Sequence, residues 1–139
     1  MEKVKEKMEK MEVTEEMVNH FREFCEAKET PYKKCPPEAR QKMETVDVPM
    51  ITAKYDALWK KADGNGDGFL NEQEFVTNAK WMHETAMEVY GWAPEFDPDL
   101  MKKGYKAISS YTPDERGVSK ESMIPYMLCA KKIRREMNI

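Results

Sequence analysis

Apolar residues along most of this chain recur at three- and four-residue intervals, which is the period of an amphipathic α-helix. Proline and glycine residues separate several of the periodic stretches. The pattern therefore predicts an all-α fold. The expected helices span residues 15–28, 37–44, 49–62, 72–90, 98–108 and about 123–136.

Residues with capping preferences mark the ends of these helices. Thr14 precedes two glutamates as an N-cap would, and Asp97 stands directly before a proline in a first helical position. Gly91 follows the fourth helix, where the left-handed conformation of a C-cap suits glycine. Pro125 would cost about 3 kcal/mol in a helix interior. We therefore expect the last helix to start late, with Ser122 as its N-cap and Pro125 in its first turn.

The connection between the helices expected at 49–62 and 72–90 reads Asp63-Gly64-Asn65-Gly66-Asp67-Gly68-Phe69-Leu70-Asn71-Glu72-Gln73-Glu74. Its carboxylate and amide side chains can approach one cation from several directions. Gly68 permits a sharp turn that wraps the chain, because glycine takes positive φ at little cost. The candidate metal ligands are the side chains of Asp63, Asn65, Asp67 and Glu74, the backbone carbonyl of Phe69, and Asn71 directly or through a water.

This twelve-residue stretch resembles the calcium loop of an EF-hand at every position that the EF-hand pattern specifies. The resemblance implies one bound Ca²⁺, with Glu74 closing the site through both carboxylate oxygens. A bidentate carboxylate suits a seven-ligand shell better than an octahedron, so calcium should be preferred over magnesium. The other interpretation is an Asp- and Gly-rich surface turn, which would have to present this order of ligands by chance.

A second, weaker copy of the arrangement follows. Residues 55–63 align with residues 101–109, with an aromatic residue before the loop in each. The second loop, 109–122, has two inserted residues, and it has Ser122 where the first loop has Glu74. From its ligand count and charge we expect this loop to bind no calcium at physiological concentrations. One complete and one degenerate hand in a pair also resembles sarcoplasmic calcium-binding proteins.

The resemblance implies a paired EF-hand unit over residues 48–139. The complete hand spans 49–90 and the degenerate hand spans 98–137. In paired hands the two loops touch through a short antiparallel bridge between their central aliphatic residues. In this chain the bridge would join Leu70 to Val118.

The N-terminal helical segment, residues 1–47, lies outside the resemblance and is expected to pack on the paired unit or to extend it. Residues 1–12 are a tail of alternating Glu and Lys, and the region after residue 28 is at most the remnant of a hand. The buried face expected on the helix at 15–28 consists of Val18, Phe21, Phe24 and Cys25.

Composition narrows the class of protein. The chain has 139 residues, of which 40% are hydrophobic and 35% charged, and no apolar run approaches the roughly 20 residues that span a bilayer. The first residues lack the apolar core of a secretory signal. The net charge of −3 gives no argument for nucleic-acid binding. The three cysteines fit reduced thiols in a cytoplasmic protein, and a disulfide between Cys25 and Cys35 is the less favoured alternative.

No catalytic motif is present, and the two histidines are far apart in sequence, so we expect no enzyme activity. The leading hypothesis is a calcium sensor. Engagement of Glu74 by the ion would reorient the 72–90 helix against the 49–62 helix and open an apolar groove for a protein partner. The alternatives are a calcium buffer that barely opens and a scaffold module in which calcium is structural.

The chain contains twelve methionines, which is a high count for its length. Methionine is flexible and polarisable, so it suits both irregular cores and grooves that accept varied partners. Both roles stay open for Met82, Met123 and Met127, and we expect Met87 and Met101 in the core.

Overall fold

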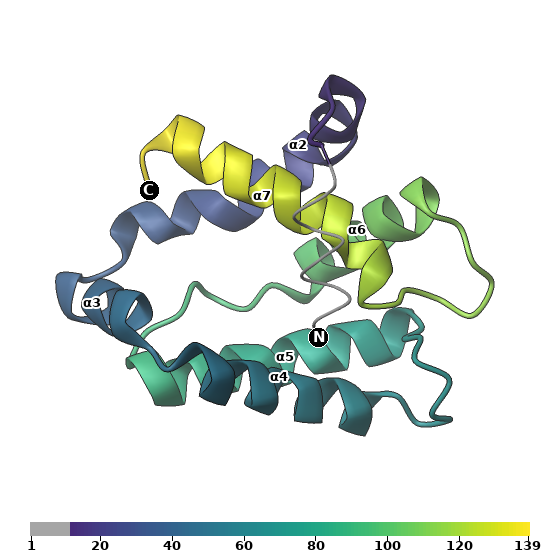
Figure 1. The fold of residues 1–139 in the computed structure, drawn as a ribbon, viewed down its shortest axis with the longest axis horizontal. Helices are drawn as coiled ribbons and strands as arrows, with labels where there is room; N and C mark the ends of the chain where they lie inside the picture. The colour runs from purple at the N-terminus through teal and green to yellow at the C-terminus, as the bar shows by residue number, and fades with distance from the viewer. Residues whose placement is uncertain (1–11) are drawn as a thin grey trace.

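The computed structural model describes residues 12–139, and every long element in that range is an α-helix (Figure 1). The described elements are α2 (Glu15–Glu29), the 3₁₀ turn η1 (Thr30–Lys34), α3 (Pro37–Thr45), α4 (Val48–Ala62), α5 (Glu72–Tyr90), α6 (Pro98–Tyr111), the 3₁₀ turn η2 (Glu121–Met123) and α7 (Ile124–Met137). The predicted all-α class is confirmed over this range. The charged tail predicted for residues 1–12 falls outside the described residues, apart from Glu12.

Capping groups determine where three of these helices begin or end. Thr14 Oγ1 accepts a hydrogen bond from Met17 N at 3.1 Å at the start of α2. Asp97 Oδ1 accepts from the Asp99 and Leu100 amides at 3.0 and 3.3 Å at the start of α6. Gly91 ends α5 with a left-handed φ of 72°. These three predicted caps are confirmed.

The predicted N-cap of the last helix is wrong. Ser122 lies inside η2, and Met123 precedes α7 without a side-chain cap. Ser122 instead exchanges hydrogen bonds with Ser119: the Ser119 amide donates to Ser122 Oγ at 2.8 Å, and the Ser122 amide donates to Ser119 Oγ at 3.1 Å. The chain therefore begins to coil one short turn earlier, and Pro125 still falls in the first turn of α7.

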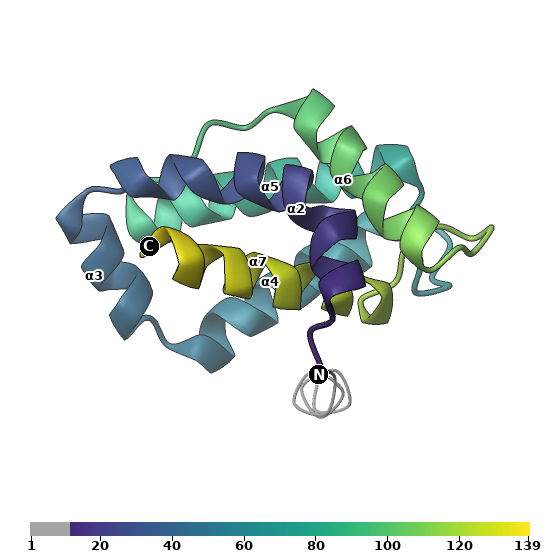
Figure 2. The same ribbon diagram turned by 90° about the horizontal axis from the view of Figure 1, so that it is seen from above.

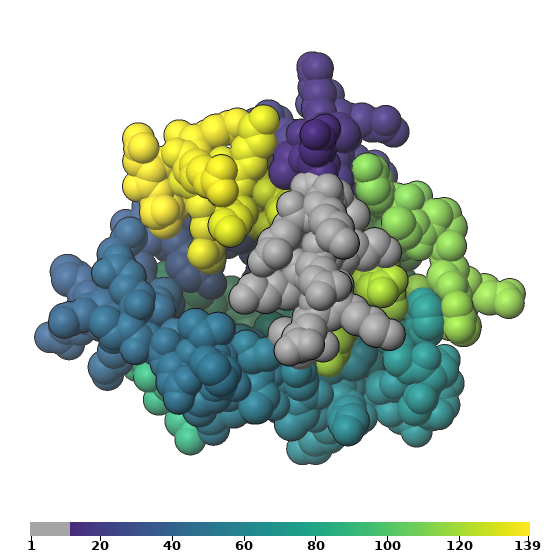
Figure 3. Space-filling view, viewed as in Figure 1, coloured from purple at the N-terminus to yellow at the C-terminus, as the bar shows by residue number. Residues whose placement is uncertain are grey.

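The helices form two layers that α6 connects. α2 packs along α7 in one layer, and α4 packs along α5 in the other (Figure 1). The space-filling view shows the same division, with α7 and the start of α2 above α4 (Figure 3). α6 contacts both α2 and α5, so it joins the two layers. Seen from above, α3 lies at one end of the molecule and the α4–α5 and α6–α7 connections lie at the other (Figure 2).

One hydrophobic core joins the N-terminal helix to the rest of the described chain. Phe21 is fully buried, and its ring centroid lies 5.2 Å from that of Tyr111 and 6.3 Å from that of Tyr126. Glu29 is also buried and pairs with Arg134 of α7 at 2.5 Å. The buried apolar residues of α2 are the four predicted ones, Val18, Phe21, Phe24 and Cys25, together with Met17.

The three cysteines are free thiols, with Cys25 and Cys129 buried between α2 and α7. Burial raises the pKa of both buried thiols, so each stays protonated at neutral pH. Cys35 is partly exposed. Among the helices of residues 12–139, none is both long and apolar enough to cross a membrane.

Candidate functional site

The six candidate metal ligands lie together on the connection between α4 and α5. Asp63 follows the last residue of α4, Asn71 caps α5, and Glu74 stands in the first turn of α5. This connection lies beside the segment that joins α6 to α7 (Figures 1 and 2). Gly66 and Gly68 have φ values of 71° and 83°, where a residue without Cβ is favoured. Gly68 therefore makes the turn that the sequence predicts.

The first three ligand side chains are turned toward backbone amides of their own loop. Asp63 accepts from Gly66 N at 3.1 Å through Oδ1 and from Gly68 N at 2.7 Å through Oδ2. Asn65 Oδ1 accepts from Asp67 N at 3.3 Å, and Asp67 Oδ1 accepts from Phe69 N at 2.9 Å. These hydrogen bonds hold the backbone of residues 63–69 in a compact turn around its own polar side chains.

Glu74 ties the first turn of α5 to both ends of the loop. Its Oε1 accepts from Asn71 N at 3.0 Å, and its Oε2 accepts from Gly64 N at 3.1 Å. Asn71 Oδ1 accepts from Glu74 N at 2.8 Å, so the two residues form a capping box. Asn71 and Glu74 thus cap α5 together, and Glu74 is positioned to link the loop to the helix.

Among residues 12–139, no three His, Cys, Asp or Glu side chains are gathered closely enough to hold a metal ion. The carboxylates of Asp63, Asp67 and Glu74 thus share one loop without converging on one point. Three like charges repel one another, and each of these side chains accepts backbone amides instead. A carboxylate has about four acceptor positions, so these bonds leave lone pairs free. The donor set, entirely oxygen, fits a hard cation such as calcium.

A short β-bridge connects this loop to the α6–α7 segment. Leu70 N donates to Val118 O at 2.8 Å, and Val118 N donates to Leu70 O at 2.9 Å, with both residues fully buried. The predicted pairing of these two residues is confirmed. After the bridge, Asn71 pairs with Glu74 three residues on, as Ser119 pairs with Ser122. Both connections therefore have the same reciprocal hydrogen bonds after the bridge, with the Glu74 carboxylate in the first and the Ser122 hydroxyl in the second.

Arg116 of the second connection contacts both an acidic residue of that connection and the first loop. Its Nε and Nη2 donate to the two oxygens of Asp114 at 3.0 and 2.8 Å. Its guanidinium carbon also lies 3.9 Å from the ring centroid of Phe69 in the first loop. The sequence gives no sign of this contact, because only the bridge brings Phe69 and Arg116 together. One carboxylate of the second connection is therefore already paired with a cation of the chain itself.

The Asp114 carboxyl provides a test of this pairing. Hydrogen bonds from Arg116 lower the pKa of Asp114 to about 2. Because the folded-state pKa is depressed, the pair persists above the ordinary value of 3.8 and is lost only as the pH falls toward 2. We expect Asp114 to remain ionised at pH 3 in a carbon-detected NMR titration of its carboxyl group. Arg116→Ala should raise the midpoint toward its ordinary value but not fully to it, because the backbone amide of residue 116 still donates to Asp114 Oδ1. An unchanged midpoint would contradict the pairing.

Gly117 allows the close approach of the two connections. Its φ is 115°, and a Cβ at this position would overlap the Leu70 carbonyl oxygen and lie 2.6 Å from the Leu70 carbonyl carbon. Gly117→Ala should therefore lower the free energy of unfolding by about 2 kcal/mol, measured by urea denaturation. Gly91→Ala is the matched control, since its φ of 72° is also positive but its Cβ would meet only Lys42 Nζ at 3.9 Å. An equal loss in the two variants would show that the bridge tolerates the added carbon.

Comparison of the chain with protein-family models, with curated proteins and with solved structures finds no match.

Proposed function

We propose that the protein binds one calcium ion in the 63–74 loop and acts as a cytoplasmic calcium sensor built from a pair of EF-hands. The observation that carries this proposal is the loop itself. Its oxygen ligands follow one another in the order that calcium coordination needs, and the loop is bridged to a second connection through Leu70 and Val118. No catalytic role is proposed.

Two features of the second connection support one ion rather than two. Ser122 stands at the position of Glu74 and offers a hydroxyl instead of a bidentate carboxylate. Arg116 neutralises Asp114 and places its positive charge against Phe69. The positive charge of Arg116 would therefore repel a second calcium ion at this connection.

Glu74 is the candidate ligand that can couple calcium binding to a movement of α5. When bound, calcium is a dication coordinated by six to eight oxygen ligands at about 2.3–2.6 Å. Five of the six candidate ligands are loop residues, whereas Glu74 belongs to α5. Phe75, the next residue, is buried, and its ring centroid lies 5.7 Å from that of Tyr105 on α6. A shift of Glu74 therefore changes how α5 packs against α6.

Calorimetric titration of calcium into the full chain tests the proposal. We expect one site with a dissociation constant of roughly 10⁻⁷ to 10⁻⁵ M, the range of EF-hand sensors. Magnesium at the same concentrations should give a much weaker signal, because its octahedral shell does not suit a bidentate glutamate. Two comparable calcium sites would show that the second connection also binds the ion, and no heat of binding would overturn the proposal.

The fluorescence of an apolar dye such as ANS, with and without calcium, separates the sensor from its alternatives. A sensor exposes apolar surface when calcium binds, so the dye signal should rise. A buffer would bind calcium with no such rise. A scaffold with a structural calcium would bind its partner as well in the presence of a chelator as in its absence.

A further inference from the structure

A cavity of about 290 Å³ lies between the two helix layers. α2, α4, α5, α6, α7 and residues 93–97 all contribute to its walls, which are largely apolar. Met82, Met123 and Met127, whose role the sequence leaves open between groove and core, all line it. Beyond Phe75 the apolar residues of α5 are only partly buried, because residues such as Ala79 and Met82 border this space.

Three polar groups in the cavity wall lack partners among the described residues. Asn78 is 4% exposed, and its Oδ1 is buried with no hydrogen bond, while its Nδ2 donates to Met82 Sδ at 3.4 Å. Tyr126 is also buried, and no described side chain or backbone group bonds its hydroxyl. Lys28 is half-buried and forms no ion pair within residues 12–139. Burial lowers its pKa. An unpaired buried polar atom such as Asn78 Oδ1 is costly in a core, so its presence in the wall indicates that the cavity can hold a ligand.

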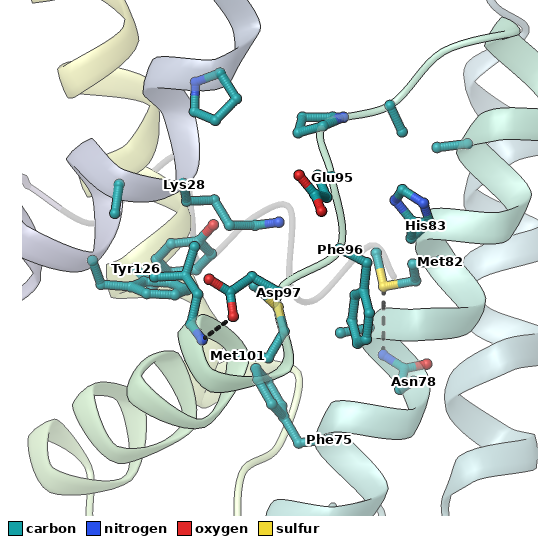
Figure 4. A pocket seen from close by; sticks show the side chains of 18 of the residues that line it. Lys28, Phe75, Asn78, Met82, His83, Glu95, Phe96, Asp97, Met101 and Tyr126 are labelled. Atoms are coloured by element: carbon teal, nitrogen blue, oxygen red, sulfur yellow. Dashed lines mark hydrogen bonds between the residues drawn. The ribbon is translucent and has the colours of Figure 1, made fainter.

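The cation and the hydroxyl lie on the same side of the cavity. Figure 4 shows Lys28 extending from α2 into the space beside the Tyr126 ring. Phe75, Met82 and Phe96 lie on the other side. One end of the cavity thus holds the Lys28 ammonium and the Tyr126 hydroxyl, with the Glu95 and Asp97 carboxylates near the ammonium. The other end is apolar apart from Asn78 and His83.

The cavity is also lined by three other ionisable residues, Glu95, Asp97 and His83, which affect the net charge around Lys28. Glu95 and Asp97 are exposed, and water and salt screen exposed charges strongly. Asp97 Oδ1 additionally accepts two amides at the N-terminus of α6, where the helix dipole offsets negative charge. His83 lies against Phe96, with ring centroids 6.0 Å apart. Lys28 is therefore the half-buried cation of this wall that forms no ion pair within residues 12–139.

We propose that this cavity binds a medium-chain carboxylic acid, with the carboxylate at Lys28 and Tyr126 and the hydrocarbon chain among the apolar residues of α5, α6 and α7. A charged donor and a neutral donor together suit a carboxylate. The volume of the cavity also suits this ligand. An apolar cavity of about 150 Å³ accommodates benzene, so a cavity of this volume fits a chain of about ten carbon atoms. The proposal does not depend on calcium in the 63–74 loop, and its test is made in the presence of a chelator.

The test is calorimetric titration of the full chain with decanoate, decan-1-ol and decylamine, each below its micelle concentration. Decanoate should bind at least about tenfold more tightly than decan-1-ol, because only the acid pairs with Lys28, and decylamine should bind most weakly. Absence of decanoate binding would overturn the proposal. If decylamine bound more tightly than decanoate, Glu95 and Asp97 would set the charge preference of the cavity, and this result would also overturn the proposal.

Two variants locate the ligand. Lys28→Met should remove the tenfold advantage of decanoate and leave the binding of decan-1-ol unchanged, whereas Lys80→Met, at an exposed position of α5, should change neither. Lys28→Gln replaces Lys28→Met if circular dichroism shows that the first variant does not fold. Met82→Trp should fill the cavity and abolish binding of both probes. Met87→Trp on the same helix should not, because Met87 is 44% exposed and its predicted place in the core is wrong. Unchanged decanoate binding in a folded Lys28 or Met82 variant would place the ligand elsewhere.

Discussion

Glu74→Gln is expected to weaken calcium binding by about 100-fold or more, so that the calorimetric signal of the wild-type chain is lost at micromolar calcium. The substitution removes one negative charge and the second ligating oxygen, and ligand charge is what sets affinity in such loops. The amide oxygen that remains can still accept from Asn71 N, where Glu74 Oε1 now accepts at 3.0 Å. A capping box takes either residue type, so the start of α5 should be preserved.

Glu84→Gln provides the matched control, because Glu84 is exposed on the same helix and far along it from the loop. Its calcium affinity should equal that of the wild type. The thermal unfolding midpoint of Glu74→Gln in chelator should also stay within a few degrees of the wild type. If Glu74→Gln bound calcium as tightly as Glu84→Gln, the 63–74 loop could not be the calcium site.

Phe21→Ala should lower the free energy of unfolding by about 3–5 kcal/mol, the loss typical of a buried phenylalanine truncated in a core. Phe21 has no exposed surface, and its ring packs against Tyr111 of α6 and Tyr126 of α7. Collapse around the deleted ring is restricted because three helices meet there. Urea denaturation followed by circular dichroism measures the change, with the slope of the transition checking that the unfolded state is unaltered.

Val48→Ala is the control for this prediction. Val48 is 62% exposed at the start of α4, so its truncation should change stability by less than about 0.5 kcal/mol. A loss below about 1 kcal/mol for Phe21→Ala would show that α2 is dispensable to the core. The N-terminal segment would then be an appendage of residues 48–139 rather than part of their fold.

Much of the helix pattern was predictable because its causes are local. Thr14, Asp97 and Gly91 act on groups within four residues of themselves, so their caps follow from sequence alone. The same holds for the turn at Gly68 and the capping box of Asn71 with Glu74. Each of these features satisfies a nearby backbone group and needs no partner from elsewhere in the chain.

The errors and omissions concern contacts between distant segments. Ser122 has the residue type of an N-cap, but its amide and hydroxyl bond Ser119 because the bridge at Val118 directs the chain into η2 first. Arg116 reaches Phe69 only after that bridge aligns the two connections. Lys28 belongs to a helix whose sequence gives no sign that a cavity lies beneath it.

The amino-acid sequence by itself determined the helices, most of their ends and the order of oxygen ligands in the 63–74 loop, because these depend on spacing and on interactions within one turn. Only the tertiary structure decided that α2 shares the core with α6 and α7, that Arg116 pairs with Asp114 against Phe69, and that a cavity remains between the layers. These depend on how helices of different lengths and side-chain volumes pack together. That packing is settled by the whole chain at once, so no local pattern records it.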